Sequence, residues 1–150
     1  MAPSKKAKRK EKIEGVKKSV IAEKTGGYYD KSPTFSFCRY DANAPWAESD
    51  DKKPTVDSIF KSLRGLESLS WREIMQASGG KSAGTNSHFV DIVKLASGAM
   101  SRVNQLNLDE NQLFSMRVQN KVRLWGLIEP DGAFYVLWFD PEHKVCPVQN

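Results

Sequence analysis

The segment from Leu113 to Phe139 constrains the fold of this chain more than any other. It holds three apolar stretches, residues 113–118, 122–129 and 133–139, separated by two short polar turns. In the second turn Pro130 presets φ, while Gly132 can adopt a positive φ. Apolar stretches of this length bounded by turn residues are typical of strands. The second and third stretches are apolar on both faces. This pattern predicts either central strands covered above and below or a curled sheet that encloses a core.

The two turns also predict how the three strands align. A three-residue loop at 119–121 would place Val118 opposite Val122, Arg117 opposite Arg123 and Met116 opposite Leu124. A bulged type I turn at 130–132 would place Leu127 opposite Tyr135, Trp125 opposite Leu137 and Arg123 opposite Phe139. Because side chains alternate along a strand, one face should collect Met116, Val118, Leu124, Gly126, Ile128, Phe134, Val136 and Trp138. The other face should collect Arg117, Arg123, Trp125, Leu127, Tyr135, Leu137 and Phe139.

The upstream half of the chain predicts one more strand and a first helix. Period-two alternation over residues 34–40 indicates a strand. Residues 41–54 are polar and form a loop, with Trp46 as its apolar anchor. A helix should begin at residues 54–55, because the side chains that follow form one apolar stripe: Val56, Ile59, Phe60 and Leu63. Gly65 suits its end.

Two further helices are expected before the three C-terminal strands. Ser70 and Glu73 have the spacing of a capping box, in which each side chain bonds the other residue's amide. Residues 78–87 contain three glycines and form a loop, and apolar residues at helical spacing predict a third helix within 88–105. The sequence therefore predicts an α+β domain. An antiparallel meander, with an added strand near 34–40, packs with about three helices.

The positive charge of the chain is concentrated at its N-terminus. The formal net charge is +5, from 23 Lys and Arg against 18 Asp and Glu. Residues 1–24 hold nine of the basic and three of the acidic side chains, so the other 126 carry 14 basic and 15 acidic. We predict that residues 1–27 form a disordered basic arm and residues 28–150 a single α+β domain. The arm could bind nucleic acid through Lys5, Lys6, Lys8, Arg9, Lys10 and Lys12, or serve only to keep the protein in solution.

Several classes of function are disfavoured by the sequence. No apolar run is long enough to cross a bilayer, and the basic N-terminus lacks the apolar region of a secretory signal, which predicts a soluble, cytoplasmic protein. Cys38 and Cys146 are the only cysteines and form no C-x-x-C motif, so we expect reduced thiols and no metal site. No phosphate-binding loop, dinucleotide fingerprint or zinc-protease helix occurs, and no cofactor is expected.

The candidate site lies on the three C-terminal strands. Arg117 and Arg123 would repel each other across the meander unless an anion or acid lay between them. Alternatively, the two stems lie along apolar surface with their heads in water, or pair with Glu110 or Asp140. His143 and Tyr135 could move protons, although a histidine on a turn is commonly structural. Asp140 could instead cap the turn that follows it, by accepting the amides of Glu142 or His143.

Residues 33–148 resemble a family of small, uncharacterised bacterial and phage-associated proteins. The shared pattern here is Phe114 to Arg117, then Arg123 to Gly126, then Phe134 to Trp138, then Asp140, Pro141 and His143, then Val145 to Pro147, with earlier motifs at Phe35 to Phe37 and Trp71 to Ile74. The resemblance implies no established activity. A weaker, fold-level resemblance is to the RelE-like toxins of toxin–antitoxin systems. It implies a sheet that cleaves RNA with arginine, lysine, tyrosine or histidine side chains.

Three hypotheses of function follow from these residues. The first is a metal-independent ribonuclease or RNA-binding protein of a toxin–antitoxin or phage-defence type. Arg117 and Arg123 would hold phosphate, Tyr135 or His143 would transfer protons, and RNA and an antitoxin-like protein would be its partners. The second is a non-catalytic module that contacts nucleic acid or a protein through the basic arm and the sheet face. The third is an assembly factor with Trp46, Trp125 or Tyr135 as exposed anchors.

Overall fold

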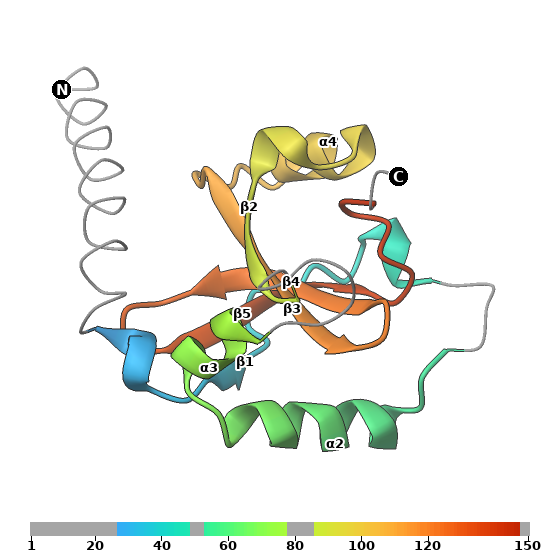
Figure 1. The fold of residues 1–150 in the computed structure, drawn as a ribbon. Coiled ribbons are helices and arrows are strands. Elements are labelled where there is room, and N and C mark those ends of the chain that lie inside the picture. Colours follow the sequence, from blue (N-terminus) through green and yellow to red (C-terminus); the bar gives the residue numbers. More distant parts are fainter. Residues whose placement is uncertain (1–26, 49–52, 78–85, 148–150) are drawn as a thin grey trace, which may run out of the picture.

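The computed structural model describes residues 27–48, 53–77 and 86–147. In this part of the chain five strands form one sheet in the order β1-β5-β4-β3-β2, with helices on both of its faces (Figure 1). The α+β class is therefore confirmed. The predicted binding residues Lys5, Lys6, Lys8, Arg9, Lys10 and Lys12 lie outside the described residues, as does most of the predicted loop at 78–87.

The three C-terminal strands form the antiparallel meander that their sequence predicts. They are β3 (Gln112–Gln119), β4 (Val122–Ile128) and β5 (Ala133–Asp140). Arg117 lies opposite Arg123. The first turn contains two residues rather than three, because Gln119 and not Val118 pairs with Val122. The backbone of Asn120 in this turn has a φ of 45°, which asparagine tolerates better than most residues.

A bulge in β5 changes the predicted faces of the last strand. Trp125 pairs with Trp138 and Gly126 with Val136, so Leu137 is an extra residue without a partner on β4. Leu137 and Trp138 consequently point to the same face, and Phe139 points to the opposite one. The predicted faces of Trp138 and Phe139 were therefore wrong. The shift also places Asp140, rather than Phe139, opposite Arg123.

The first two predicted helices are present. α2 (Val56–Glu67) begins after Thr55, whose hydroxyl accepts the amide of Ser58 at 3.1 Å. It continues through Gly65 instead of ending there. α3 (Trp71–Gln76) carries the predicted capping box between Ser70 and Glu73. Trp71 is fully buried and donates its indole N–H to the carbonyl of Gly132 at 2.9 Å, which ties α3 to the turn before β5.

The prediction of one helix within 88–105 was wrong in its first half. Residues His88–Asp91 form β2, an edge strand antiparallel to β3, and the 3-10 turn η3 (Ile92–Lys94) follows. Only Ser97–Gln105 is helical, as α4. The apolar spacing of this segment fits a helix, but pairing with β3 supplies the backbone of residues 88–91 with hydrogen-bond partners that local spacing cannot reveal.

The N-terminal strand is shorter than predicted and parallel to its neighbour. β1 (Thr34–Ser36) follows the short turn η1 (Tyr28–Asp30) and pairs with β5, so the sheet is mixed. The chain then turns, with the amide of Tyr40 donating to the carbonyl of Phe37 at 3.1 Å. Beyond this turn lies η2 (Pro45–Ala47), which carries the buried Trp46.

The sheet separates two apolar cores. The core on the α4 side contains η2 and the segment after β5, with Leu113, Trp125, Leu137, Trp138 and Val145 among its members. The core on the α2 and α3 side contains Trp71, Phe114, Met116, Leu124, Phe134 and Val136. The central strands are therefore covered above and below, which explains why β4 and β5 are apolar on both faces.

Candidate anion-binding site

Two arginines lie side by side at the β3–β4 hairpin. Arg117 and Arg123 occupy paired positions of the two strands, and both side chains are half-buried on the α4 side of the sheet. Their guanidinium groups share one acceptor, the carbonyl of Asn120, at 3.1 Å from Arg117 Nε and 2.7 Å from an Arg123 terminal nitrogen. Among the described residues, neither guanidinium forms a salt bridge with a carboxylate.

The electrostatics of this pair are unfavourable without a ligand. Burial and the neighbouring Arg117 lower the pKa of Arg123 to about 10, and the charge of Asp140 acts in the opposite direction. Arg123 is still protonated at neutral pH, so two positive charges face each other across the hairpin. Like charges at paired positions destabilise a sheet, and a local conflict of this kind is typical of a functional site.

The segment before β2 holds Arg117 in place. Asn86 accepts a hydrogen bond from a terminal nitrogen of Arg117 at 2.8 Å, and the hydroxyl of Ser87 accepts the Arg117 amide at 2.9 Å. His88 follows, exposed and opposite Ser115, and so lies on the same face as Arg117 and diagonal to it. His88 was not among the residues predicted from the sequence, because the apolar spacing of this segment predicts a helix. An alternating strand reading of residues 88–91 would have found it.

Asp140 organises the end of β5 behind the arginine pair. Its carboxylate is fully buried and accepts the amide of Lys144 at 2.7 Å, the amide of Val145 at 2.9 Å and the indole N–H of Trp125 at 3.1 Å. The predicted capping role is therefore present, but with amides one or two residues further along. These bonds fold the segment after β5 back against the sheet at the end where Arg123 lies.

The structure places the two predicted proton-transfer residues at opposite ends of the sheet. His143 lies in the turn after Asp140, at the arginine end, with a φ of 60°. Its Nδ1 is buried and has no hydrogen-bond partner among the described residues. Tyr135 pairs with Leu127, four residues along β4 from Arg123 and thus about 13 Å away. The guanidinium of Arg39 stacks 4.7 Å from the Tyr135 ring centre.

The residues proposed as exposed anchors are not exposed. Trp46 and Trp125 are both buried, and their indole rings belong to the core on the α4 side. Tyr135 is half-buried beneath Arg39. The prediction of these three residues as exposed anchors was therefore wrong, because the two tryptophan side chains fill the core and Arg39 covers Tyr135.

Other features of the described residues bear on the class of protein. Cys38 is exposed and Cys146 half-buried, and both are free thiols. Within residues 27–48, 53–77 and 86–147, no three acidic, histidine or cysteine side chains gather closely enough to hold a metal ion. The helices of that part of the chain are too short or too polar to cross a membrane. A comparison of the chain with protein-family models, curated proteins and solved structures finds no match.

Proposed function

We propose that this protein binds single-stranded RNA, with a backbone phosphate held between Arg117 and Arg123. The observation that carries the proposal is the pairing of two half-buried guanidinium groups that share a carbonyl and form no salt bridge with a carboxylate of the described chain. A phosphate between them would accept hydrogen bonds from both groups. It would also remove the repulsion that lowers the pKa of Arg123.

The charge distribution favours a local contact over a broad basic surface. Outside residues 1–24 the chain has one more acidic than basic side chain, so the domain as a whole does not attract a polyanion. The arginine pair would therefore supply the site-specific contact. The basic arm would add affinity for RNA that falls steeply with salt concentration and depends little on the structure of the RNA.

Fluorescence anisotropy with a labelled single-stranded RNA tests this proposal. We expect Arg117→Gln and Arg123→Gln each to weaken binding about tenfold or more, because each removes a charge-assisted hydrogen bond. Arg39→Gln removes the same charge at the far end of the sheet and serves as the matched control. Equal affinity in all three variants would contradict the proposal.

A further variant distinguishes the contribution of the arginine pair to RNA affinity from that of the basic arm. Replacing Lys5, Lys6, Lys8, Arg9, Lys10 and Lys12 by glutamine should lower affinity and reduce its dependence on salt, while leaving the effect of Arg123→Gln intact. If only this variant loses binding, the alternative of contact through the arm alone is favoured.

RNA cleavage is a second candidate, favoured by the position of His143 at the arginine end. His143 would take the proton of a ribose 2′-hydroxyl as its oxygen attacks the adjacent phosphorus. The bond from phosphorus to the 5′-oxygen would break, this oxygen would take a proton from water, and a 2′,3′-cyclic phosphate would remain. The arginines would stabilise the charge of the transition state. This role corresponds to that of a RelE-like toxin, in a toxin–antitoxin or phage-defence setting with an antitoxin-like partner. Tyr135 has no part in this mechanism, because it lies too far from the arginine pair.

Expression in a bacterial host tests cleavage separately from binding. A growth defect that disappears in His143→Gln, with RNA affinity retained, would support it. Cyclic phosphate ends on the products should be present with the wild-type chain and absent with His143→Gln. A wild-type chain that binds RNA but neither slows growth nor produces such ends is a binding module only.

A further inference from the structure

An apolar groove lies on the other side of the sheet from the arginine pair, between α2 and the strands. It is lined only by apolar and aromatic side chains: Phe37, Tyr40, Ile59, Phe60, Leu63, Leu124, Val136 and Phe139. Its volume is about 240 Å³, below the range of about 300–1,000 Å³ typical of sites for drug-sized ligands. A groove of this size, with no polar lining atom, suits one or two apolar side chains of a protein.

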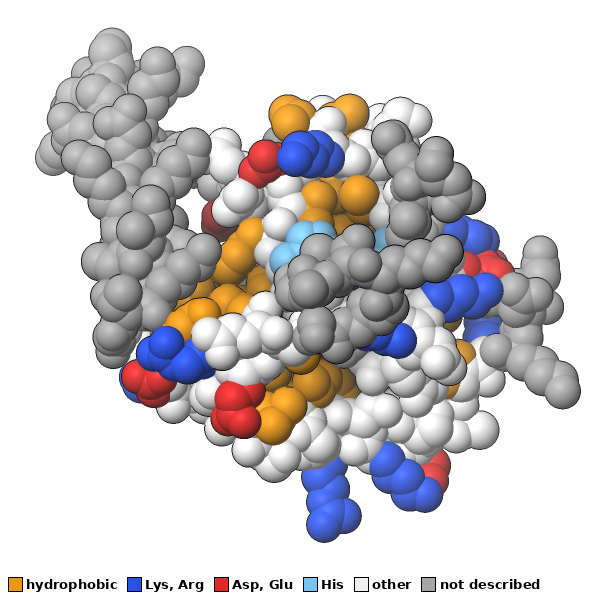
Figure 2. Space-filling view, in the orientation of Figure 1, with side chains coloured by type: hydrophobic (Ala, Val, Ile, Leu, Met, Phe, Trp, Pro, Cys, Tyr) orange, Lys and Arg blue, Asp and Glu red, His pale blue; other side chains and the backbone are white. Residues whose placement is uncertain are grey.

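The exposed apolar residues of the described chain gather around this groove. Within residues 27–48, 53–77 and 86–147, five large hydrophobic side chains are exposed, namely Phe37, Tyr40, Val56, Phe60 and Val93. Three of them line the groove, and Val56 lies one helical turn before Phe60 on α2. The predicted apolar stripe of α2 is therefore only partly buried: Leu63 is buried, whereas Val56 and Phe60 are 69% and 63% exposed. Apolar atoms are visible between α2 and the sheet in Figure 2. A concentration of this kind marks an interaction surface.

The charges beside Phe60 indicate which partner fits. Asp57 and Arg64 are seven residues apart, two helical turns, and lie on the same flank of α2 as Phe60. Two copies of α2 packed antiparallel about a twofold axis near Phe60 would place Asp57 of each copy beside Arg64 of the other. On the same flank the exposed side chain of Phe60 lies next to the groove. Phe60 of one copy could therefore fill the groove of the other, and a twofold interface requires such a self-complementary patch.

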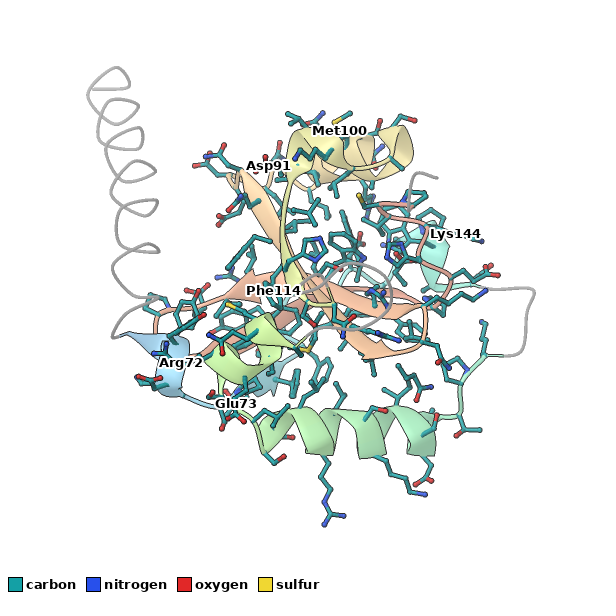
Figure 3. All side chains as sticks on the ribbon, in the orientation of Figure 1. Arg72, Glu73, Asp91, Met100, Phe114 and Lys144 are labelled. Atoms are coloured by element: carbon teal, nitrogen blue, oxygen red, sulfur yellow. The ribbon has the colours of Figure 1, made fainter. Side chains whose placement is uncertain are left out.

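We propose that the α2 flank is a dimer interface, in which Phe60 of each chain enters the groove of a second copy. Two reciprocal pairs between Asp57 and Arg64 flank the apolar centre. The inference is independent of RNA binding, because the arginine pair lies on the opposite side of the sheet. In the monomer Asp57 already contacts Lys61 at 2.7 Å. Both of these side chains are mostly exposed, so this contact is weak and Asp57 can turn to a partner. Figure 3 shows the side chains of α2 that project away from the sheet.

Light scattering coupled to gel filtration, run on the full chain over a range of concentrations, tests the interface. The wild-type chain should elute at twice its 16.9 kDa mass. Phe60→Glu should elute as a monomer with an unchanged circular dichroism spectrum, because the side chain is mostly exposed. Val93→Glu changes the most exposed apolar residue away from the groove and should remain a dimer.

A charge exchange distinguishes a second copy from any other partner. Asp57→Arg and Arg64→Asp should each weaken the dimer at least tenfold, because each places like charges beside each other twice. The double variant should recover most of the affinity, because the reciprocal pairs reform with reversed sign. A wild-type chain that is monomeric at all concentrations would overturn the proposal. So would a dimer unaffected by Phe60→Glu, or a double variant no better than the single ones.

Discussion

Asp41 and Arg102 are 61 residues apart in the chain and form a two-bond ion pair on the α4 side of the sheet. Both bonds, from Arg102 Nε and a terminal nitrogen, are 2.7 Å long. The same carboxylate accepts the indole N–H of Trp138 at 3.0 Å and the amide of Asn43 at 3.2 Å. One side chain therefore joins the loop after β1 to α4 and to β5.

Replacing Asp41 should unfold the protein more readily than most single changes. Asp41→Asn leaves Arg102 half-buried without its counter-charge and directs an amide group at other donors. We expect a loss of about 3 kcal/mol in the free energy of unfolding. Urea denaturation followed by tryptophan fluorescence measures this. A loss below about 1 kcal/mol would show that the ion pair contributes little.

The contribution of Asp41 should depend on pH. Its hydrogen bonds with Arg102 lower the pKa of the carboxyl group below 3.8. A lowered pKa in the folded state stabilises the protein above the unfolded pKa of about 3.9, and that stabilisation is lost as the pH falls through the folded value. The difference in unfolding free energy between wild type and Asp41→Asn should thus be constant from neutral pH to about 5, and shrink below about 4. A difference that is the same at all these pH values would contradict this.

Gly126 should tolerate no side chain. A Cβ atom at this position would collide with the backbone carbonyl of Tyr135 and would also touch the Phe134 ring. Because Gly126 lies beside the bulge in β5, the strand cannot move away without breaking its pairing. Gly126→Ala should cost about 3 kcal/mol or more. Gly65→Ala, where a Cβ meets nothing within 4 Å, is the matched control and should be neutral or stabilising. Thermal melts compare the two variants.

Asp140 should affect stability and anion affinity in opposite directions. Asp140→Asn weakens the bonds to Trp125, Lys144 and Val145 and should cost about 2 kcal/mol. It also removes the negative charge opposite Arg123, so phosphate or RNA should bind a few-fold more tightly. Paired denaturation and anisotropy measurements test both effects. A variant that is less stable and also binds more weakly would show that Asp140 mainly shapes the site.

Much of the fold could be predicted from local patterns. Turn residues at 119–121 and 130–132 delimited the meander, and the spacing of Ser70 and Glu73 identified the start of α3. The pairing of Arg117 with Arg123 was correct because it depends only on a short hairpin. The bulge at Leu137 could not be predicted from local patterns. It places Trp138 against Trp46 and within hydrogen-bond distance of Asp41, two residues that are remote in sequence.

Predictions that depended on distant contacts were the ones that failed. The segment 88–105 has helical apolar spacing, yet its first four residues pair with β3 as a strand. For the same reason His88 was not recognised as a neighbour of Arg117. Tyr135 lies on β5 opposite Leu127, whereas His143 follows the far end of that strand. The two residues therefore lie at opposite ends of the sheet, a separation that the sequence motifs did not indicate.

If Arg117 and Arg123 hold one phosphate together, both guanidinium groups should respond to the same bound RNA. Nuclear magnetic resonance of the arginine Nε–H groups, recorded while a short single-stranded RNA is added, measures this response. We expect the signals of Arg117 and Arg123 to shift in parallel, with one dissociation constant, while that of Arg39 stays unchanged. Binding of RNA that leaves the Arg117 and Arg123 signals unmoved would contradict it.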